Sequence, residues 1–84
     1  MSTMDVNEID SRSAQNRAFI IANFALGKQQ SFTTESLMVE IRGKLGVWVT
    51  YAEVQSRLDA LLGFGLLVRR YPNMYVVRAI DADE

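Results

Sequence analysis

The chain has 84 residues, enough for one small domain, and its 49% of apolar residues is typical of a globular protein. It contains no cysteine and no histidine, which excludes disulfide bonds, a thiolate nucleophile and the usual zinc ligands. The formal net charge of −1 is unevenly distributed, because residues 11–80 hold all nine basic residues against four acidic ones, a balance of +5.

The remaining six acidic residues lie at the two ends of the chain, in residues 1–10 and 81–84. Acidic ends are either ordinary solvated tails or, with a basic domain between them, flexible segments that limit non-specific binding of a polyanion. No stretch reaches the ~18 apolar residues of a membrane span, and the acidic start is unlike a signal peptide. We therefore expect a cytoplasmic protein, of cellular, phage or plasmid origin, that binds no membrane.

The first predicted helix follows an acidic, flexible arm over residues 1–10. It begins at Ser11 or Ser13 as the N-cap, and it ends near Gly27. The domain itself is expected over residues 11–80, with an acidic tail over residues 81–84.

Apolar residues surround most of this first helix, whereas a surface helix of a monomer needs only one apolar stripe. We therefore predict a homodimer contact formed by Ile20, Ile21 and Phe24. The alternative is that the hairpin and the N-terminal arm of the same chain cover this side of the helix.

The second helix is predicted to start at Thr33, the N-cap, with Phe32 and Leu37 placed for a hydrophobic staple. Apolar residues recur at helical spacing as far as Leu45, and Gly46 then favours a C-terminal stop.

The third helix has a capping-box sequence at its start, because Thr50 is followed three residues later by Glu53. Its apolar stripe leads to a glycine-rich end, where Gly65 and Leu66 fit a Schellman-type stop. Only five residues, 46–50, separate this helix from the second, a spacing typical of a helix-turn-helix.

Two β-rich runs, residues 66–70 and 75–79, flank a turn at Pro72 and Asn73 and predict a β-hairpin. The expected fold is therefore mainly α with a small hairpin, in the order of three helices followed by the hairpin.

The stretch from Thr50 to Arg70, with its capped start, the Arg57-Leu58 pair and Gly65-Leu66 before a basic strand, resembles winged helix-turn-helix transcription regulators. It is most similar to the small bacterial repressors of the MarR and PadR types. The resemblance covers roughly residues 33–79. It implies that the third helix enters the DNA major groove and that the hairpin, the wing, lies along the backbone or minor groove. Two features depart from the family: the wing is short, and the third helix has little positive charge.

These features predict a sequence-specific DNA-binding protein, a small dimeric regulator. Gln55 and Ser56 would read base edges, and the basic wing would hold phosphates. The residues that this interpretation assigns to DNA are Arg42, Lys44, Thr50, Tyr51, Ala52, Gln55, Ser56, Arg57, Arg69, Arg70, Tyr71 and Asn73.

Each assignment has a structural alternative. The third helix would simply expose a solvated face, and Asp59 on that face disfavours DNA. The wing arginines would protect an edge strand against aggregation. Turn chemistry explains Asn73, and the helix dipole explains Lys44. Trp48 would pack on the edge of the domain or contact a partner.

Catalysis has little support in the sequence, since no phosphate-binding glycine loop and no paired carboxylates in a plausible pocket are visible. We expect no enzyme activity, no cofactor and no metal. The rival function is a winged-helix module that binds another protein and not DNA.

Overall fold

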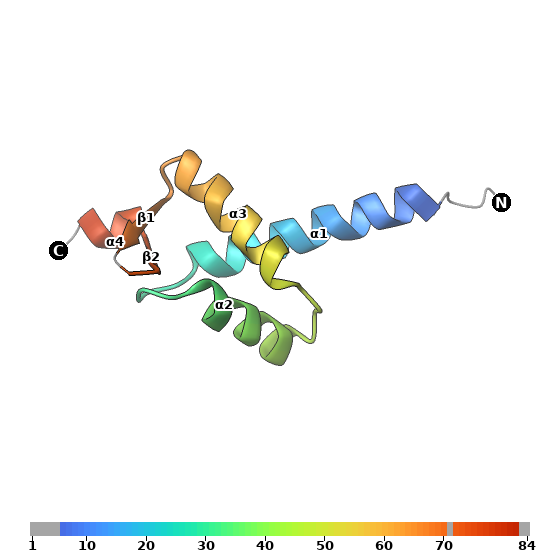
Figure 1. Ribbon diagram of the computed structural model, residues 1–84, viewed down its shortest axis with the longest axis horizontal. Coiled ribbons are helices and arrows are strands. Elements are labelled where there is room, and N and C mark those ends of the chain that lie inside the picture. Colours follow the sequence, from blue (N-terminus) through green and yellow to red (C-terminus); the bar gives the residue numbers. More distant parts are fainter. Residues whose placement is uncertain (1–5, 71, 83–84) are drawn as a thin grey trace.

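The structure is a computed structural model, and it describes residues 6–70 and 72–82, with side chains over residues 13–70 and 72–80. In chain order, the elements within these residues are α1 (Val6–Leu26), α2 (Thr34–Glu40), the π-helical segment η1 (Ile41–Leu45), α3 (Tyr51–Gly63), β1 (Leu67–Arg70), β2 (Met74–Val77) and α4 (Arg78–Ala82). The fold is mainly helical with a small antiparallel hairpin, as the sequence predicts. Helices α1, α2 and α3 cross one another, and the hairpin stands at one end of this bundle (Figure 1).

Helix α1 is longer than predicted, because it begins at Val6 and not at Ser11 or Ser13. Nothing between Val6 and Leu26 stops a helix, since this stretch contains neither glycine nor proline. The second half of the expected flexible arm is therefore helical, whereas residues 1–5 lie outside the described part. The C-terminal end at Leu26, directly before Gly27, agrees with the prediction.

Helix α2 starts as predicted, with Thr33 as its N-cap. The Thr33 hydroxyl accepts a hydrogen bond from the Ser36 amide, and the Ser36 hydroxyl accepts one from the Thr33 amide, both at 3.0 Å. This reciprocal capping box was not predicted here. The helix continues through η1 to Gly46, whose φ of 66° is the left-handed conformation expected at a glycine stop.

Helix α3 also begins at the predicted cap, because the Thr50 hydroxyl accepts a hydrogen bond from the Glu53 amide at 3.1 Å. The Glu53 carboxylate contacts the Thr50 hydroxyl and forms an ion pair with Arg17 of α1 at 2.5 Å, which ties α3 to α1. The end of α3 has both Schellman hydrogen bonds, from Leu66 N to Leu61 O and from Gly65 N to Leu62 O, each 3.0 Å long.

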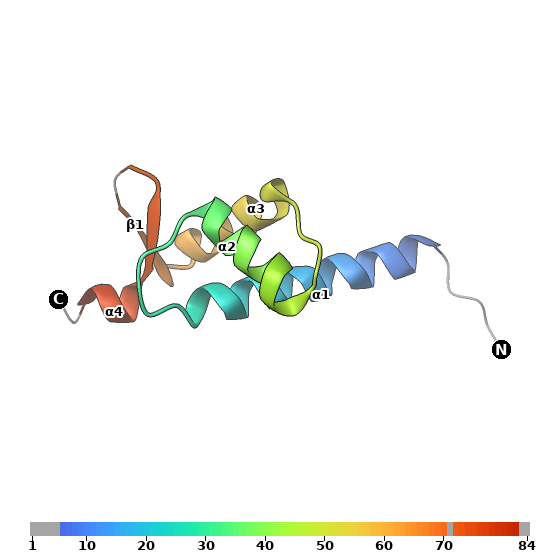
Figure 2. The same ribbon diagram turned by 90° about the horizontal axis from the view of Figure 1, so that it is seen from below.

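The hairpin is shorter than predicted, because β2 ends at Val77 and the chain turns directly into α4. Arg78 was predicted to lie on the second strand, but it is the first residue of α4. Its Nε donates to the Gly65 carbonyl oxygen at 2.6 Å. Phe32 joins the other edge of β2 through two backbone hydrogen bonds with Tyr75, of 2.9 and 2.7 Å. The hairpin is thus fixed to the connector between α1 and α2 (Figure 2).

The core lies where α1, α2, α3 and the base of the hairpin meet. The buried apolar side chains are Ile21, Ala25, Phe32, Leu37, Ile41, Val49, Val54, Leu58, Leu61, Leu67, Tyr75 and Val76.

The predicted dimer contact on α1 needs correction, because Ile21 is only 1% exposed and belongs to the core. Ile20 and Phe24 are half-buried and pack against the same core. The side of α1 that faces outward instead holds Phe19, which is 70% exposed. The apolar pattern predicted two covered sides of α1, but it could not show which side the rest of the chain covers.

Candidate nucleic-acid interface

A polar hollow of about 330 Å³ lies between the start of α2, helix α3 and the hairpin. Its lining residues are Thr33, Thr34, Glu35, Tyr51, Gln55, Arg69, Asn73 and Tyr75. The structure thus brings together four residues that the sequence assigns to DNA, namely Tyr51, Gln55, Arg69 and Asn73. Its α2 side was not predicted, because the contribution of Thr33, Thr34 and Glu35 depends on how α2 crosses α3.

Gln55 is the centre of a hydrogen-bond network inside this hollow. Its Oε1 accepts from the Thr34 hydroxyl at 2.7 Å, and its Nε2 donates to the Tyr75 hydroxyl oxygen at 2.8 Å and to Asp59 Oδ1 at 3.0 Å. Thr34 and Tyr75 are 4% and 2% exposed. Both amide hydrogens and the amide oxygen of Gln55 are therefore engaged within the chain. The predicted base reader links α2, α3 and β2 in this structure.

Of helix α3, Tyr51 and Gln55 line the hollow, whereas Ala52 and Ser56 border a second hollow that α3 shares with α1. Tyr51 is 53% exposed, and Ala52, Ser56 and Asp59 are exposed as well. Asp59, which counted against DNA in the sequence, accepts the hydrogen bond from Gln55. Thr50 is exposed at the same end of α3, where its hydroxyl already serves as the N-cap.

Arg57 does not belong to this face. It is half-buried between α1 and α3, where it lines two further hollows beside Ala18. Its Nε is buried and has no hydrogen-bond partner within the described part of the chain. Arg57 directly precedes the buried Leu58, and α1 packs against this side of α3.

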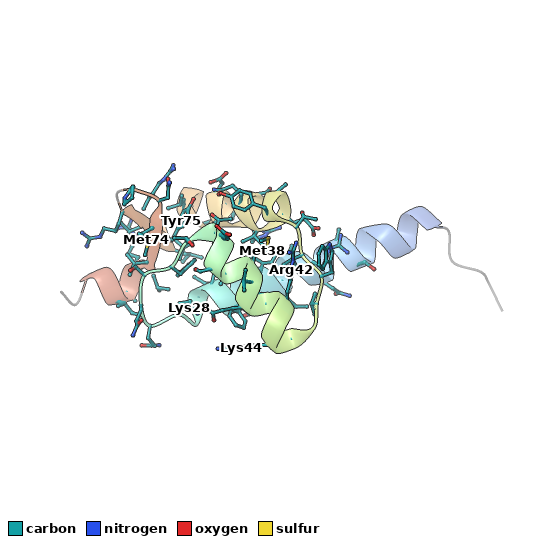
Figure 3. All side chains as sticks on the ribbon, turned by 60° about the horizontal axis from the view of Figure 1, so that its bottom comes forward. Lys28, Met38, Arg42, Lys44, Met74 and Tyr75 are labelled. Carbon is teal, nitrogen blue, oxygen red and sulfur yellow. The ribbon has the colours of Figure 1, made fainter. Side chains whose placement is uncertain are left out.

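Arg42 and Lys44 lie on the side of α2 and η1 away from the hairpin (Figure 3). The Arg42 Nε donates to the Val49 carbonyl oxygen at 2.8 Å, and its guanidinium stacks on Trp48 at 3.7 Å from the ring centroid. Arg42 therefore holds the turn between η1 and α3. Trp48 lies on the edge of the domain, as expected, and it is 69% exposed.

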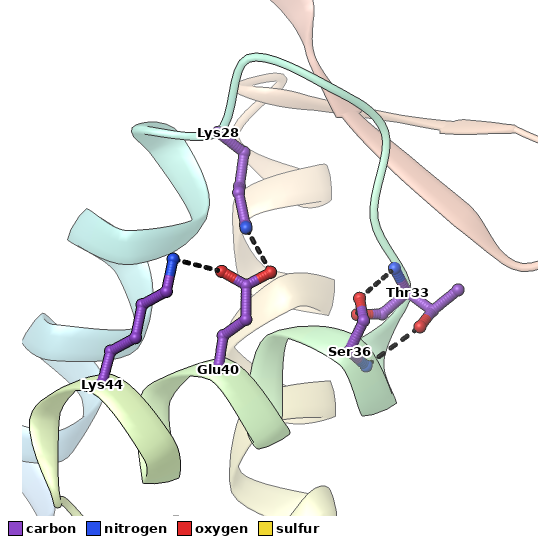
Figure 4. Close-up of polar contacts among 5 residues, drawn as sticks. All are labelled: Lys28, Thr33, Ser36, Glu40 and Lys44. Carbon is purple, nitrogen blue, oxygen red and sulfur yellow. Dashed lines mark hydrogen bonds and ion pairs between the residues drawn. The ribbon is translucent and has the colours of Figure 1, made fainter.

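Lys44 and Lys28 converge on the single carboxylate of Glu40 (Figure 4). The Lys44 Nζ lies 3.6 Å from Glu40 Oε2, and Lys28 forms a hydrogen-bonded ion pair with Oε1. The hydrogen bond from Lys28, together with the charges of both lysines, lowers the pKa of Glu40 below its usual value despite partial burial. This cluster joins the end of α1 to α2, and it is separate from the hollow beside the hairpin.

The basic hairpin borders the hollow through Arg69. Arg69 pairs with Tyr75 and Arg70 with Met74 across the hairpin, and both arginines are exposed. Because side chains alternate along a strand, Arg69 and Arg70 leave opposite faces, and Arg69 lines the hollow. Asn73 is exposed in the turn. Tyr71, also predicted to contact DNA, lies outside the described residues.

Comparisons with protein-family models, curated proteins and solved structures found no match to this chain. Over residues 6–70 and 72–82, no helix is both long and apolar enough to pass through a bilayer. The same residues contain no group of three or more acidic side chains that could hold a metal ion.

Proposed function

We propose that this protein binds double-stranded DNA with the surface formed by α3 and the hairpin. The observation that carries the proposal is the polar hollow in which Tyr51 of α3, Arg69 of β1 and Asn73 of the turn line one concave surface. An exposed helix beside a short basic hairpin is the arrangement that winged-helix regulators use on DNA.

The contacts divide into two classes on this surface. Arg69 supplies positive charge for phosphates inside the hollow and Arg70 on the opposite face of the hairpin, with Tyr51 and Asn73 as neutral donors. Ser56 is the polar side chain of α3 that remains for base edges, and the small Ala52 leaves room for close approach. Since Gln55 holds the elements together, its contribution to binding is to position them.

Charge limits the affinity of one chain. Glu35 lines the hollow and Asp59 is exposed on α3, so they oppose the two wing arginines. With about two phosphates neutralised per chain, the logarithm of the binding constant should fall with the logarithm of salt at a slope of about −1.8. That slope corresponds to a loss of about 12-fold between 50 and 200 mM salt.

The test is fluorescence anisotropy of a labelled random-sequence duplex at these two salt concentrations. Arg69→Ala should weaken binding to every sequence alike and reduce the slope by about 0.9. Lys44→Ala is the matched control, because it removes one exposed charge away from the hollow and should leave the slope unchanged. If both variants behave like the wild type, the wing does not contact DNA.

The rival function, a protein-interaction module, is favoured by one observation. Three large apolar side chains of α2, η1 and the turn are at least half exposed: Val39 at 56%, Leu45 at 50% and Trp48 at 69%. Exposed apolar patches often mark protein contacts. An absence of duplex binding at 20 mM salt would favour this function over DNA binding.

A further inference from the structure

The hollow between α1 and α3, called the α1–α3 hollow below, has a volume of about 330 Å³. Its walls are mainly apolar, because Ala14 and Ala18 of α1 and Ala52 of α3 line it. Ile21, which is 1% exposed, also lines the hollow, so that it reaches the core. Small-molecule sites are concave and mostly apolar, with a few polar groups that fix the ligand. The α1–α3 hollow has this lining.

Arg57 is the polar group of this hollow that lacks a partner. Its Nε is the one buried side-chain nitrogen or oxygen without a hydrogen bond within residues 13–70 and 72–80. None of the ion pairs among these residues includes Arg57. A buried donor that has lost its water without gaining an acceptor destabilises a folded chain, and it therefore needs an explanation. An acceptor bound in the hollow would supply the missing partner.

The charges around the hollow favour a monoanion. Glu53 also lines it, but its Oε2 pairs with Arg17 at 2.5 Å and its Oε1 accepts from the Thr50 hydroxyl at 3.3 Å. Glu53 is therefore neutralised by Arg17 and not by Arg57, although Arg57 follows it by one turn of α3. Two arginines against one glutamate give a local balance of +1. One negative charge on a ligand compensates this balance, whereas a dianion would leave an unpaired charge beside Glu53.

We propose that the α1–α3 hollow binds a small monocarboxylate with an apolar body. The carboxylate accepts hydrogen bonds from Arg57 Nε and from a terminal nitrogen of the same guanidinium, the bidentate geometry that suits arginine. The apolar body covers the alanines and Ile21, where it displaces water from apolar surface. Arg57 also borders a hollow of about 290 Å³ on the side of Gln15, but no core residue lines that hollow. The body therefore lies in the α1–α3 hollow.

The first test is an NMR titration of the ¹⁵N-labelled wild type with acetate, butanoate, hexanoate and octanoate. Octanoate should shift the Arg57 Nε–H signal and the amide signals of residues that line the hollow. Since each buried methylene group strengthens binding by up to about four-fold, octanoate should bind at least about ten-fold more tightly than acetate. Octanol and octylamine have the same chain length without the negative charge, and each should bind at least about ten-fold more weakly than octanoate.

The second test uses variants that separate the charge from the hollow. Arg57→Met removes the guanidinium without leaving a partner unpaired, so it should keep the fold and bind octanoate about ten-fold more weakly. Lys44→Met is the matched control, because it removes an exposed positive charge that borders neither hollow. Ala14→Trp and Gln15→Trp place the same bulky side chain at adjacent exposed positions, of which Ala14 alone lines the α1–α3 hollow. Ala14→Trp should block octanoate, and Gln15→Trp should not.

An affinity for octanol or for acetate equal to that for octanoate would overturn the proposal. Wild-type affinity in Arg57→Met would overturn it as well, and so would equal affinities of the two tryptophan variants. Circular dichroism of each variant should match the wild type, and the shift of the Arg57 signal tests the site in the unaltered chain if a variant fails to fold. All titrations are done without DNA, so a failure here and a negative anisotropy result are separate outcomes.

Discussion

Replacing Gln55 by alanine distinguishes the base-reading role predicted from the sequence from the structural role of joining α2, α3 and β2. The substitution removes the acceptor for the Thr34 hydroxyl and the donor for the Tyr75 hydroxyl. Each buried polar group left without a partner costs about 1–3 kcal/mol of folding free energy. Two such groups, in a hollow that water can enter, give an expected loss of about 2–3 kcal/mol.

Urea unfolding followed by circular dichroism measures this loss, and Gln30→Ala, in the exposed connector, is the matched control. A double-mutant cycle tests whether part of this loss comes from the hydrogen bond between Gln55 and Tyr75. In a Tyr75→Phe background, Gln55→Ala should cost about 1 kcal/mol less, because one of the two orphaned groups is already gone.

A base-reading Gln55 would behave differently. The alanine variant would keep its stability within about 0.5 kcal/mol and lose about 1–3 kcal/mol of binding on the specific DNA site alone. That result would refute the assignment of Gln55 as the residue that joins α2, α3 and the hairpin.

Two further predictions concern stability. Gly46→Ala should cost about 1–2 kcal/mol because Gly46 has a φ of 66°, whereas Gly43→Ala, in η1, should raise stability by about 0.5–1 kcal/mol. A Cβ at either position meets no atom within 4 Å, so equal effects in urea unfolding would contradict the conformational explanation. Glu40→Gln should cost about 0.5 kcal/mol at pH 7, since it removes the negative charge that Lys28 and Lys44 both contact. Because the pKa of Glu40 is lowered on folding from 4.5, its contribution is present above pH 4.5 and is lost as the pH falls through the folded value. Unfolding curves at pH 7 and pH 3 should therefore show a difference between variant and wild type that shrinks in acid, and a constant difference would contradict the ion-pair explanation.

Local signals in the sequence predicted the ends of the helices well. Thr33, Thr50, Gly46 and Gly65 act through hydrogen bonds and backbone angles within a few residues, so their roles can be deduced from short stretches of chain. The start of α1 was predicted too late, because Ser11 and Ser13 are compatible with a cap and also with a helix interior.

Long-range contacts could not be predicted in the same way. Two of the three partners of Gln55, Tyr75 and Thr34, lie 20 and 21 residues away in the chain, on β2 and α2. The covered side of α1 is likewise decided by which elements pack on it, which is why Ile21 was placed at a surface although it lies in the core. The sequence indicated which polar residues of α3 and the hairpin belong to the candidate site. The structure adds the hydrogen bonds that some of them, such as Thr50 and Gln55, form within the chain.

The backbone bridge between Phe32 and Tyr75 affects where the chain can change in length. It joins the connector after α1 to β2, so an insertion near Phe32 would shift this pairing and the stacked rings of the two residues, whose centroids are 6.0 Å apart. Pro72 and Asn73, the described residues at the tip of the hairpin, form no such backbone bridge to another element, and doubling a flexible loop there costs only about 0.6 kcal/mol. A longer hairpin with more residues to reach a ligand could therefore be grafted at the turn without disturbing the core beneath it.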